Sequence, residues 1–126
     1  MTTLSTEQVA HLTTMMDERF ARELDEIRAV AARSRDERAQ EALTGTLADR
    51  ADQVLSEIAT AADYAIVRQD IEDVRDIVAA RRRLASGHYG VCVDCGEAIA
   101  YERLLAYPTA KRCITCQREH ERRHAV

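Results

Sequence analysis

Four cysteines are the residues whose types and spacing point most directly to chemistry in this 126-residue chain. They form two Cys-x-x-Cys pairs with seventeen residues between them: Cys92, Cys95, Cys113 and Cys116. Each pair on a tight turn directs two sulfurs toward one point, and two pairs complete the tetrahedral ligand set that a structural zinc ion prefers. The pattern therefore predicts one structural Zn²⁺ held by all four cysteines. Iron, a redox-active dithiol and two disulfides are the alternatives.

Three histidines lie near the cysteines in sequence, namely His88, His120 and His124. Each could replace a sulfur ligand, but four thiolates already complete a tetrahedral site, so we expect the histidines at the surface. A redox role would require a reactive thiol in a strand–helix–strand setting, and the sequence shows no such alternation. Because every cysteine belongs to the metal pattern, a reducing cytoplasm is the expected compartment.

The positions of glycine and proline indicate where the helices that must position the cysteines begin and end. Gly45 is the only glycine before position 87, and the only proline is Pro108, so residues 5–85 permit helix with one break. Ser5 and Gln8 have the spacing of a capping box, which predicts a helix start at this point. A second helix is expected to begin after Gly45 and to end at Ser86-Gly87. Residues 117–124 indicate a short C-terminal helix.

Apolar residues in the two long helices recur every three or four positions, which predicts one buried face on each. The first face comprises Leu12, Met16, Phe20, Leu24, Ile27 and Ala31. The second comprises Tyr64, Val67, Ile71, Val74 and Val78. Because a short turn joins the helices, they must lie antiparallel to bury these faces. We therefore expect an all-α fold, with a coiled-coil hairpin at 1–86, its tip at about 44–52, and a four-Cys finger with the C-terminal helix at 87–126.

Composition narrows the possible functions. The chain has no tryptophan and only 4% aromatic residues, which suits thin helical packing better than a thick core. The net charge of −4 gives no bulk attraction to nucleic acid. No segment approaches the roughly 20 apolar residues of a membrane helix, and residues 1–5 lack the features of a secretory signal. We therefore expect neither direct nucleic-acid binding nor a membrane association.

Asp49 and Asp52 stand three residues apart at the expected tip of the hairpin. Acidic residues are common in the first turn of a helix, where they face the positive end of the helix dipole. A long arm could also present these carboxylates to a cation, a basic surface or a metal-bearing site on another protein. The sequence indicates neither a partner base nor a pocket beside these aspartates, so the chain is not expected to be an enzyme.

Residues 87–117 resemble the zinc finger of the DksA/TraR family of bacterial proteins. The resemblance rests on four segments: Gly87-His88-Tyr89-Gly90-Val91-Cys92-Val93-Asp94-Cys95-Gly96, Arg103-Leu104, Pro108-Thr109-Ala110 and Cys113-Ile114-Thr115-Cys116. The helical region from about 10 to 86 is similar to the family's coiled-coil arm in length and placement. The resemblance implies a transcription regulator that binds RNA polymerase and inserts the arm into its secondary channel.

The family's arm carries a D-x-x-D pattern at its tip, and Asp49-Arg50-Ala51-Asp52 fits that pattern. In another register, in which the family's tip reads Asp-Arg-Ala, Asp49 alone takes the leading role. Full-length members also have an additional N-terminal helix, for which the residues before Asp49 are too few, so this chain is similar to a shortened member.

The resemblance does not extend to the alarmone guanosine tetraphosphate (ppGpp). Where full-length members place basic residues for it, gap-free counting from the cysteines gives Asp76, Tyr107 and Gln117. A retained alarmone site is therefore not predicted. Two other functions stay open: a zinc-stabilised module that binds a different protein, and a DNA-binding zinc finger that would use the arginines near the cysteines.

Overall fold

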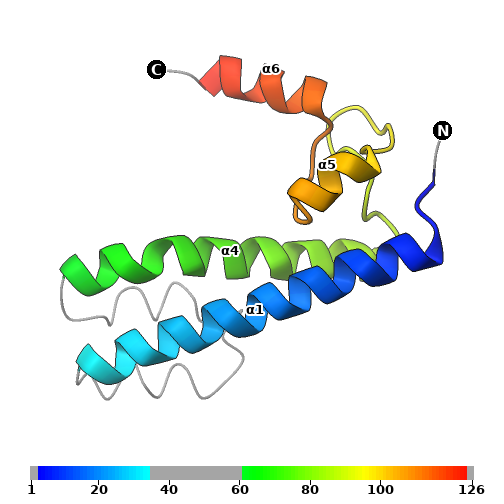
Figure 1. The fold of residues 1–126 in the computed structure, drawn as a ribbon. Helices are drawn as coiled ribbons and strands as arrows, with labels where there is room; N and C mark the ends of the chain where they lie inside the picture. The colour runs from blue at the N-terminus through cyan, green and yellow to red at the C-terminus, as the bar shows by residue number, and fades with distance from the viewer. Residues whose placement is uncertain (1–2, 35–60, 125–126) are drawn as a thin grey trace. The chain divides into compact units, whose positions relative to one another are not determined.

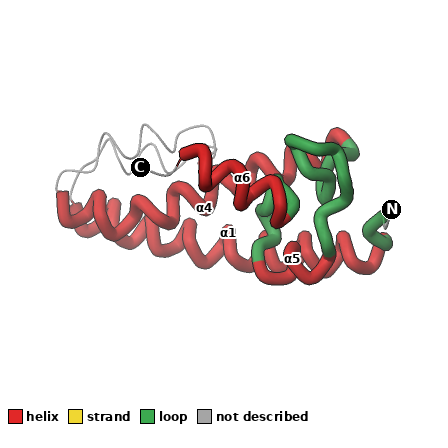
Figure 2. The backbone as a smooth tube through the Cα atoms, turned by 90° about the horizontal axis from the view of Figure 1, so that it is seen from above, coloured by secondary structure: helices red, strands yellow, loops and turns green. Residues whose placement is uncertain are grey.

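The computed structural model describes residues 3–34 and 61–124, and within those ranges the secondary structure is almost entirely helical (Figure 1). The helices are α1 (Thr6–Ser34), α4 (Ala61–Ser86), α5 (Tyr101–Ala106) and α6 (Ile114–His124). Loops occupy most of the segment between α4 and α6 (Figure 2). Val91 and Ala98 form an isolated antiparallel bridge in this segment. The all-α prediction is confirmed. The expected tip at 44–52 lies outside the described residues.

The chain divides into two units. One consists of Glu18–Val78, and the other combines Met1–Asp17 with Ala79–Val126. The first turns of α1 and the last turns of α4 thus belong to the same unit as the four cysteines. Among the described helices, none combines the length and the apolar character needed to cross a membrane.

A capping box begins α1, as the sequence predicts. The Ser5 N–H donates to Gln8 Oε1 at 2.9 Å, and the Gln8 N–H donates to Ser5 Oγ at 3.1 Å. The two bonds satisfy donors that the first helical turn would otherwise leave without partners.

Replacing Ser5 with alanine is expected to destabilise the fold by about 1 kcal/mol, because one of these donors loses its acceptor. Urea unfolding of the zinc-loaded protein would measure the change. Thr6→Ala is the matched control, since it removes a hydroxyl one position further along. An equal loss of stability in both variants would contradict the capping role.

The end of α4 is set by a left-handed glycine. Gly87 has φ +79°, a value that strains residues with a side chain. Its N–H donates to the Leu84 carbonyl at 3.3 Å, and the His88 N–H donates to the Arg83 carbonyl at 2.8 Å. This pair of bonds is a Schellman motif, and it confirms the predicted helix end at Ser86-Gly87.

Within the unit Glu18–Val78, α1 and α4 pack antiparallel through an apolar seam. Arg19 pairs with Asp73, and Glu26 approaches Asp70, so residue numbers rise on one helix as they fall on the other. Among the described residues of this unit, the fully or almost fully buried apolar ones are Ile27, Val30, Val67, Ile71, Val74 and Ile77.

Two details of the predicted seam were wrong. Tyr64 is 40% exposed, and Val30 and Ile77 are buried although they were not assigned to the seam. Ile77, three residues after Val74, takes the buried position expected for Val78, which is only half-buried. Phe20 and Leu24 are also half-buried, and the side chain of Ala31 lies outside the described residues.

Candidate metal centre

The first cysteine pair lies on a tight hairpin-like turn. The Cys92 N–H donates to the Glu97 carbonyl at 2.8 Å, and the Gly96 N–H donates back to the Cys92 carbonyl at 3.0 Å. Gly96 has φ +75°, which the turn requires and which glycine adopts without strain. The turn brings the sulfurs of Cys92 and Cys95 within 4.8 Å of each other.

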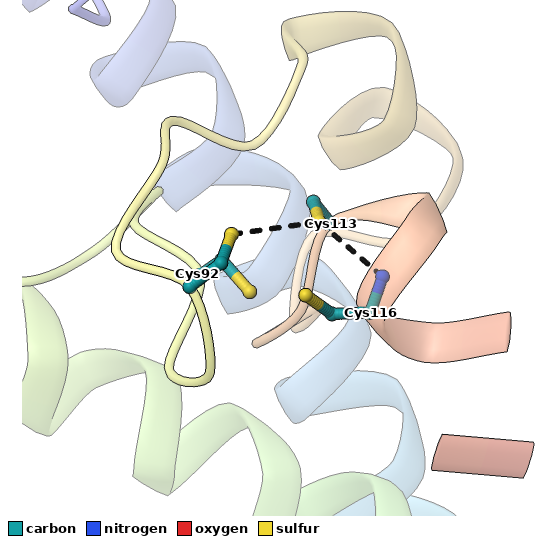
Figure 3. Close-up of side chains that lie close together, drawn as sticks. Cys92, Cys113 and Cys116 are labelled. Carbon is teal, nitrogen blue, oxygen red and sulfur yellow. Dashed lines mark hydrogen bonds between the residues drawn. The ribbon is translucent and has the colours of Figure 1, made fainter. Parts of the chain in front are cut away.

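The second cysteine pair lies at the start of α6. Cys113 immediately precedes the helix, and its carbonyl accepts the Gln117 N–H at 2.9 Å. The Cys116 N–H donates to Cys113 Sγ at 3.4 Å, so the backbone in the first turn of α6 holds the Cys113 sulfur in place (Figure 3).

All four sulfurs lie within 4.8 Å of one another, and the described residues contain no other such group of potential metal ligands. The Cys95 and Cys113 sulfurs are 3.9 Å apart. A tetrahedron with zinc–sulfur bonds of about 2.3 Å has edges of roughly 3.8 Å, so this spacing fits a zinc ion. None of the four cysteines is in a disulfide.

The electrostatic environment also suits a cation. Burial raises the pKa of Cys92, but backbone N–H groups of Cys95, Cys113 and Asp94 outweigh that effect and lower it to about 6. The pKa of Cys116 is raised, first through its hydrogen bond with Cys113. Four sulfurs this close cannot all ionise without a compensating charge, which a bound Zn²⁺ supplies.

Hydrogen bonds to backbone carbonyls position the segment 108–112, which leads into the second cysteine pair. The donors come from α4, from the loop that follows it, from the turn of the first cysteine pair and from α5, so they tie four parts of this unit to one segment of the chain. The bonds run from Tyr89 Oη to Pro108 O (2.6 Å), Arg83 Nη2 to Thr109 O (3.2 Å), Val93 N to Lys111 O (2.9 Å) and Arg103 Nε to Arg112 O (3.0 Å). Burial raises the pKa of Tyr89 to about 12, so its hydroxyl stays protonated as the donor.

A small apolar cluster supports the centre. Leu12, Cys92, Ile99 and Leu104 are almost fully buried in it, with 2% exposure or less. Leu12, which the sequence placed in the hairpin seam, lies in the core of the finger's unit. Leu104 comes from α5, a helix that is not among those predicted from the sequence. The apolar pair Tyr101 and Leu104 at i, i+3, with Glu102 in the first turn, is the signal that could have revealed it.

The arginines near the cysteines make intramolecular contacts. Arg81 pairs with Asp17 at 2.6 Å, Arg112 pairs with Asp94 at 2.7 Å, and Arg122 pairs with Glu119. A DNA-binding patch would need such groups directed at phosphates, so these pairs do not favour it.

The histidines are not among the clustered metal ligands. His88 is exposed and contacts Ser86 Oγ through Nδ1 at 3.0 Å. His120 and His124 stack on α6 with ring centroids 4.2 Å apart.

The remaining sequence-predicted residues lie elsewhere. Asp49 and Asp52 are outside the described residues. Tyr107 and Gln117 line one groove of about 470 Å³, together with Arg103 and Arg118. Asp76 is exposed on α4 in the unit Glu18–Val78.

Comparison with known proteins agrees with this arrangement. Residues 87–122 match the family described as "Prokaryotic dksA/traR C4-type zinc finger". A protein named RNA polymerase-binding transcription factor DksA, from Caulobacter vibrioides, is 38% identical over 79 residues, which cover 63% of this chain and 56% of that relative. The match thus spans little more than half of the relative's length. An uncharacterized protein of Aquifex aeolicus is 40% identical over 53 residues, covering 42% of this chain and 37% of that protein.

A solved structure extends the similarity to the helices. Transcription factor DksA2 from Pseudomonas aeruginosa superposes with a TM-score of 0.52 and 25% sequence identity, covering 92% of this chain and 88% of that chain. The structural comparison thus reaches beyond residues 87–122, the segment that the family matches. Residues 87–122 therefore identify this chain as carrying a C4-type zinc finger of the DksA/TraR family, which holds one structural zinc ion.

Proposed function

We propose that this chain is an RNA polymerase-binding regulator of transcription initiation that acts through the tip of its helical hairpin. The observation that carries the proposal is the 38% identity over 79 residues to the Caulobacter DksA, which is named as an RNA polymerase-binding transcription factor. The family match at residues 87–122 supports it. The antiparallel pairing of α1 and α4 within the unit Glu18–Val78 supports it, because a helical hairpin is the element that the proposal requires. A binding role also suits a metal centre whose ligand set is complete and leaves no open position for substrate.

In this proposal, Cys92, Cys95, Cys113 and Cys116 are the zinc ligands, and the metal has a structural role. The ion would fix the turn that carries Cys92 and Cys95 against the start of α6. Residues Asp49 and Asp52 would act at the polymerase, where carboxylates near a magnesium-bearing centre can perturb the bound cation or its loops.

Binding would be tested by capture of a purified bacterial RNA polymerase on the immobilised, zinc-loaded chain. We expect retention that other secondary-channel factors compete away. Retention of DNA with a steep salt dependence would favour the DNA-binding alternative instead. Failure to retain polymerase, with the chain folded and zinc-loaded, would favour an interaction module for another protein.

The double variant Asp49→Asn and Asp52→Asn is expected to bind polymerase within about twofold of the wild type while losing its effect on initiation. The amides keep the shape of the tip and remove the charge. In vitro transcription with purified polymerase measures the effect, and the single variants decide between the two tip registers. Normal regulation by the double variant would refute the tip mechanism.

The same assay tests the alarmone. Because Asp76, Tyr107 and Gln117 stand where basic residues would be needed, guanosine tetraphosphate is expected to leave the chain's effect unchanged. For the Asp49→Asn and Asp52→Asn experiment, Asp25→Asn is the control for charge removal, because Asp25 is exposed on α1.

A further inference from the structure

A layer of ionisable side chains interrupts the apolar seam between α1 and α4 within the unit Glu18–Val78. Glu23 is on α1 and is only 8% exposed, although no pattern in the sequence predicts a buried carboxyl group at this position. Asp73 approaches it from α4. Arg19 contacts both carboxyl groups, through Nε to Glu23 Oε1 at 3.2 Å and through Nη2 to Asp73 Oδ1 at 2.7 Å.

A second pair of carboxyl groups adjoins the first. Asp70 on α4 is within hydrogen-bonding range of Glu26 on α1 and also feels the charge of Asp73. The Gln69 side-chain amide donates to Asp73 Oδ1 at 3.2 Å. The groups that face the Glu23–Asp73 pair are therefore Arg19 and the neighbouring Glu26 from α1, with Gln69 and Asp70 from α4. If all four carboxyl groups were ionised, they would carry three more charges than the Arg19 guanidinium neutralises.

Two oxygens in this layer are buried without a hydrogen-bond partner, namely Glu23 Oε2 and Asp70 Oδ2. A buried carboxylate oxygen that accepts no hydrogen bond is costly. A proton on Glu23 removes that cost, because the resulting O–H can donate to the Asp73 carboxylate in a charge-assisted hydrogen bond.

The acid–base balance of the pair agrees with this geometry. Burial raises the pKa of Glu23 to about 7, and the hydrogen bond and charge of Asp73 act in the same direction. For Asp73, burial is outweighed by hydrogen bonds from Arg19 and Glu23, and its pKa is lowered. The shared proton therefore resides on Glu23, with Asp73 as the charged acceptor.

We propose that Glu23 and Asp73 share one proton across the α1–α4 contact, and that loss of this proton to solvent loosens the helix pair as the pH rises through the neutral range. Folding of this unit takes up a proton, because Glu23 binds it more tightly in the folded state than in the unfolded chain. The stabilisation is present at mildly acidic pH and is lost as the pH rises through the folded-state pKa of about 7. The inference is independent of any role at RNA polymerase.

Carbon-13 NMR of the side-chain carboxyl groups tests the proton directly in the zinc-loaded protein. The Glu23 resonance is expected to titrate with a midpoint near 7. A midpoint below about 5.5 would overturn the proposal, since no shared proton would then remain at neutral pH.

Amide hydrogen exchange tests the consequence for the helix pair. After correction for the intrinsic pH dependence of exchange, the opening equilibrium at residues 67–77 should be on the order of tenfold larger at about pH 8 than at about pH 5.5. Glu23→Gln keeps the size of the side chain without the titration and is expected to lose most of this dependence. Asp73→Asn is expected to weaken it in the same way.

Glu18→Gln is the matched control, because Glu18 is an exposed glutamate on the same helix. It is expected to retain the wild-type pH dependence. If Glu23→Gln also retains the wild-type dependence, the proposal is wrong. If that variant does not fold, the Glu23 titration in the wild-type protein decides the question.

Discussion

Replacement of Cys92 by serine is expected to abolish zinc binding and to unfold the finger. Cys92 is 2% exposed and joins the metal centre to the apolar cluster beneath it. Structural zinc in small domains contributes an apparent binding free energy of about 10–16 kcal/mol, as much as or more than the roughly 5–15 kcal/mol that holds a typical domain folded. Loss of one zinc ligand should therefore unfold the whole zinc-finger segment.

Zinc content by atomic spectroscopy should fall from one ion per chain to almost none in the Cys92→Ser variant. Amide NMR signals of residues 88–117 should collapse to the narrow range of an unfolded chain. Val93→Ser is the matched control, since Val93 lies in the same turn and its side chain is 53% exposed. A Cys92→Ser protein that keeps one zinc and dispersed signals would show that the metal is not held as proposed.

Truncation of Leu12 to alanine is expected to have the second largest effect, although Leu12 is distant in sequence from every cysteine. Its side chain is fully buried against Cys92, Ile99 and Leu104. Removing a buried leucine side chain typically costs about 2–5 kcal/mol, because the transfer energy is lost and a cavity remains. Here the cavity would open directly beside a metal ligand.

Two measurements separate this effect from a simple loss of helix. Urea unfolding of the zinc-loaded protein gives the change in stability, and transfer of zinc to a coloured chelator gives the rate of metal release. We expect Leu12→Ala to accelerate release by more than tenfold, in line with the lost stability. His11→Ala is the control, as His11 is the exposed neighbour on the same helix. Equal rates for the two variants would contradict a role for Leu12 in supporting the centre.

Local patterns allowed much of this protein to be predicted from the sequence. The capping box at Ser5, the glycine end of α4 and the clustering of the cysteines each depend on a few residues with fixed spacing. Their geometry is set by backbone sterics and by the preferences of zinc, which do not depend on the rest of the chain.

The features that were missed depend on contacts between distant segments. Tyr89, Arg83 and Arg103 donate to backbone carbonyls, and a carbonyl acceptor carries no side-chain signature that a sequence could show. The burial of Glu23 was missed for another reason. Charged residues are almost never buried without partners, and its partners Arg19 and Asp73 come partly from the other helix.

The placement of Leu12 in the finger's unit also sets an order of events during synthesis. Leu12 leaves the ribosome 92 positions before Leu104, its partner in the apolar cluster. Closing so long a loop costs conformational entropy before any contact compensates it, and such long-range pairing slows folding. The first turns of α1 must therefore wait for the finger segment to emerge, so completion of this unit and stable retention of zinc are late steps in the maturation of the protein.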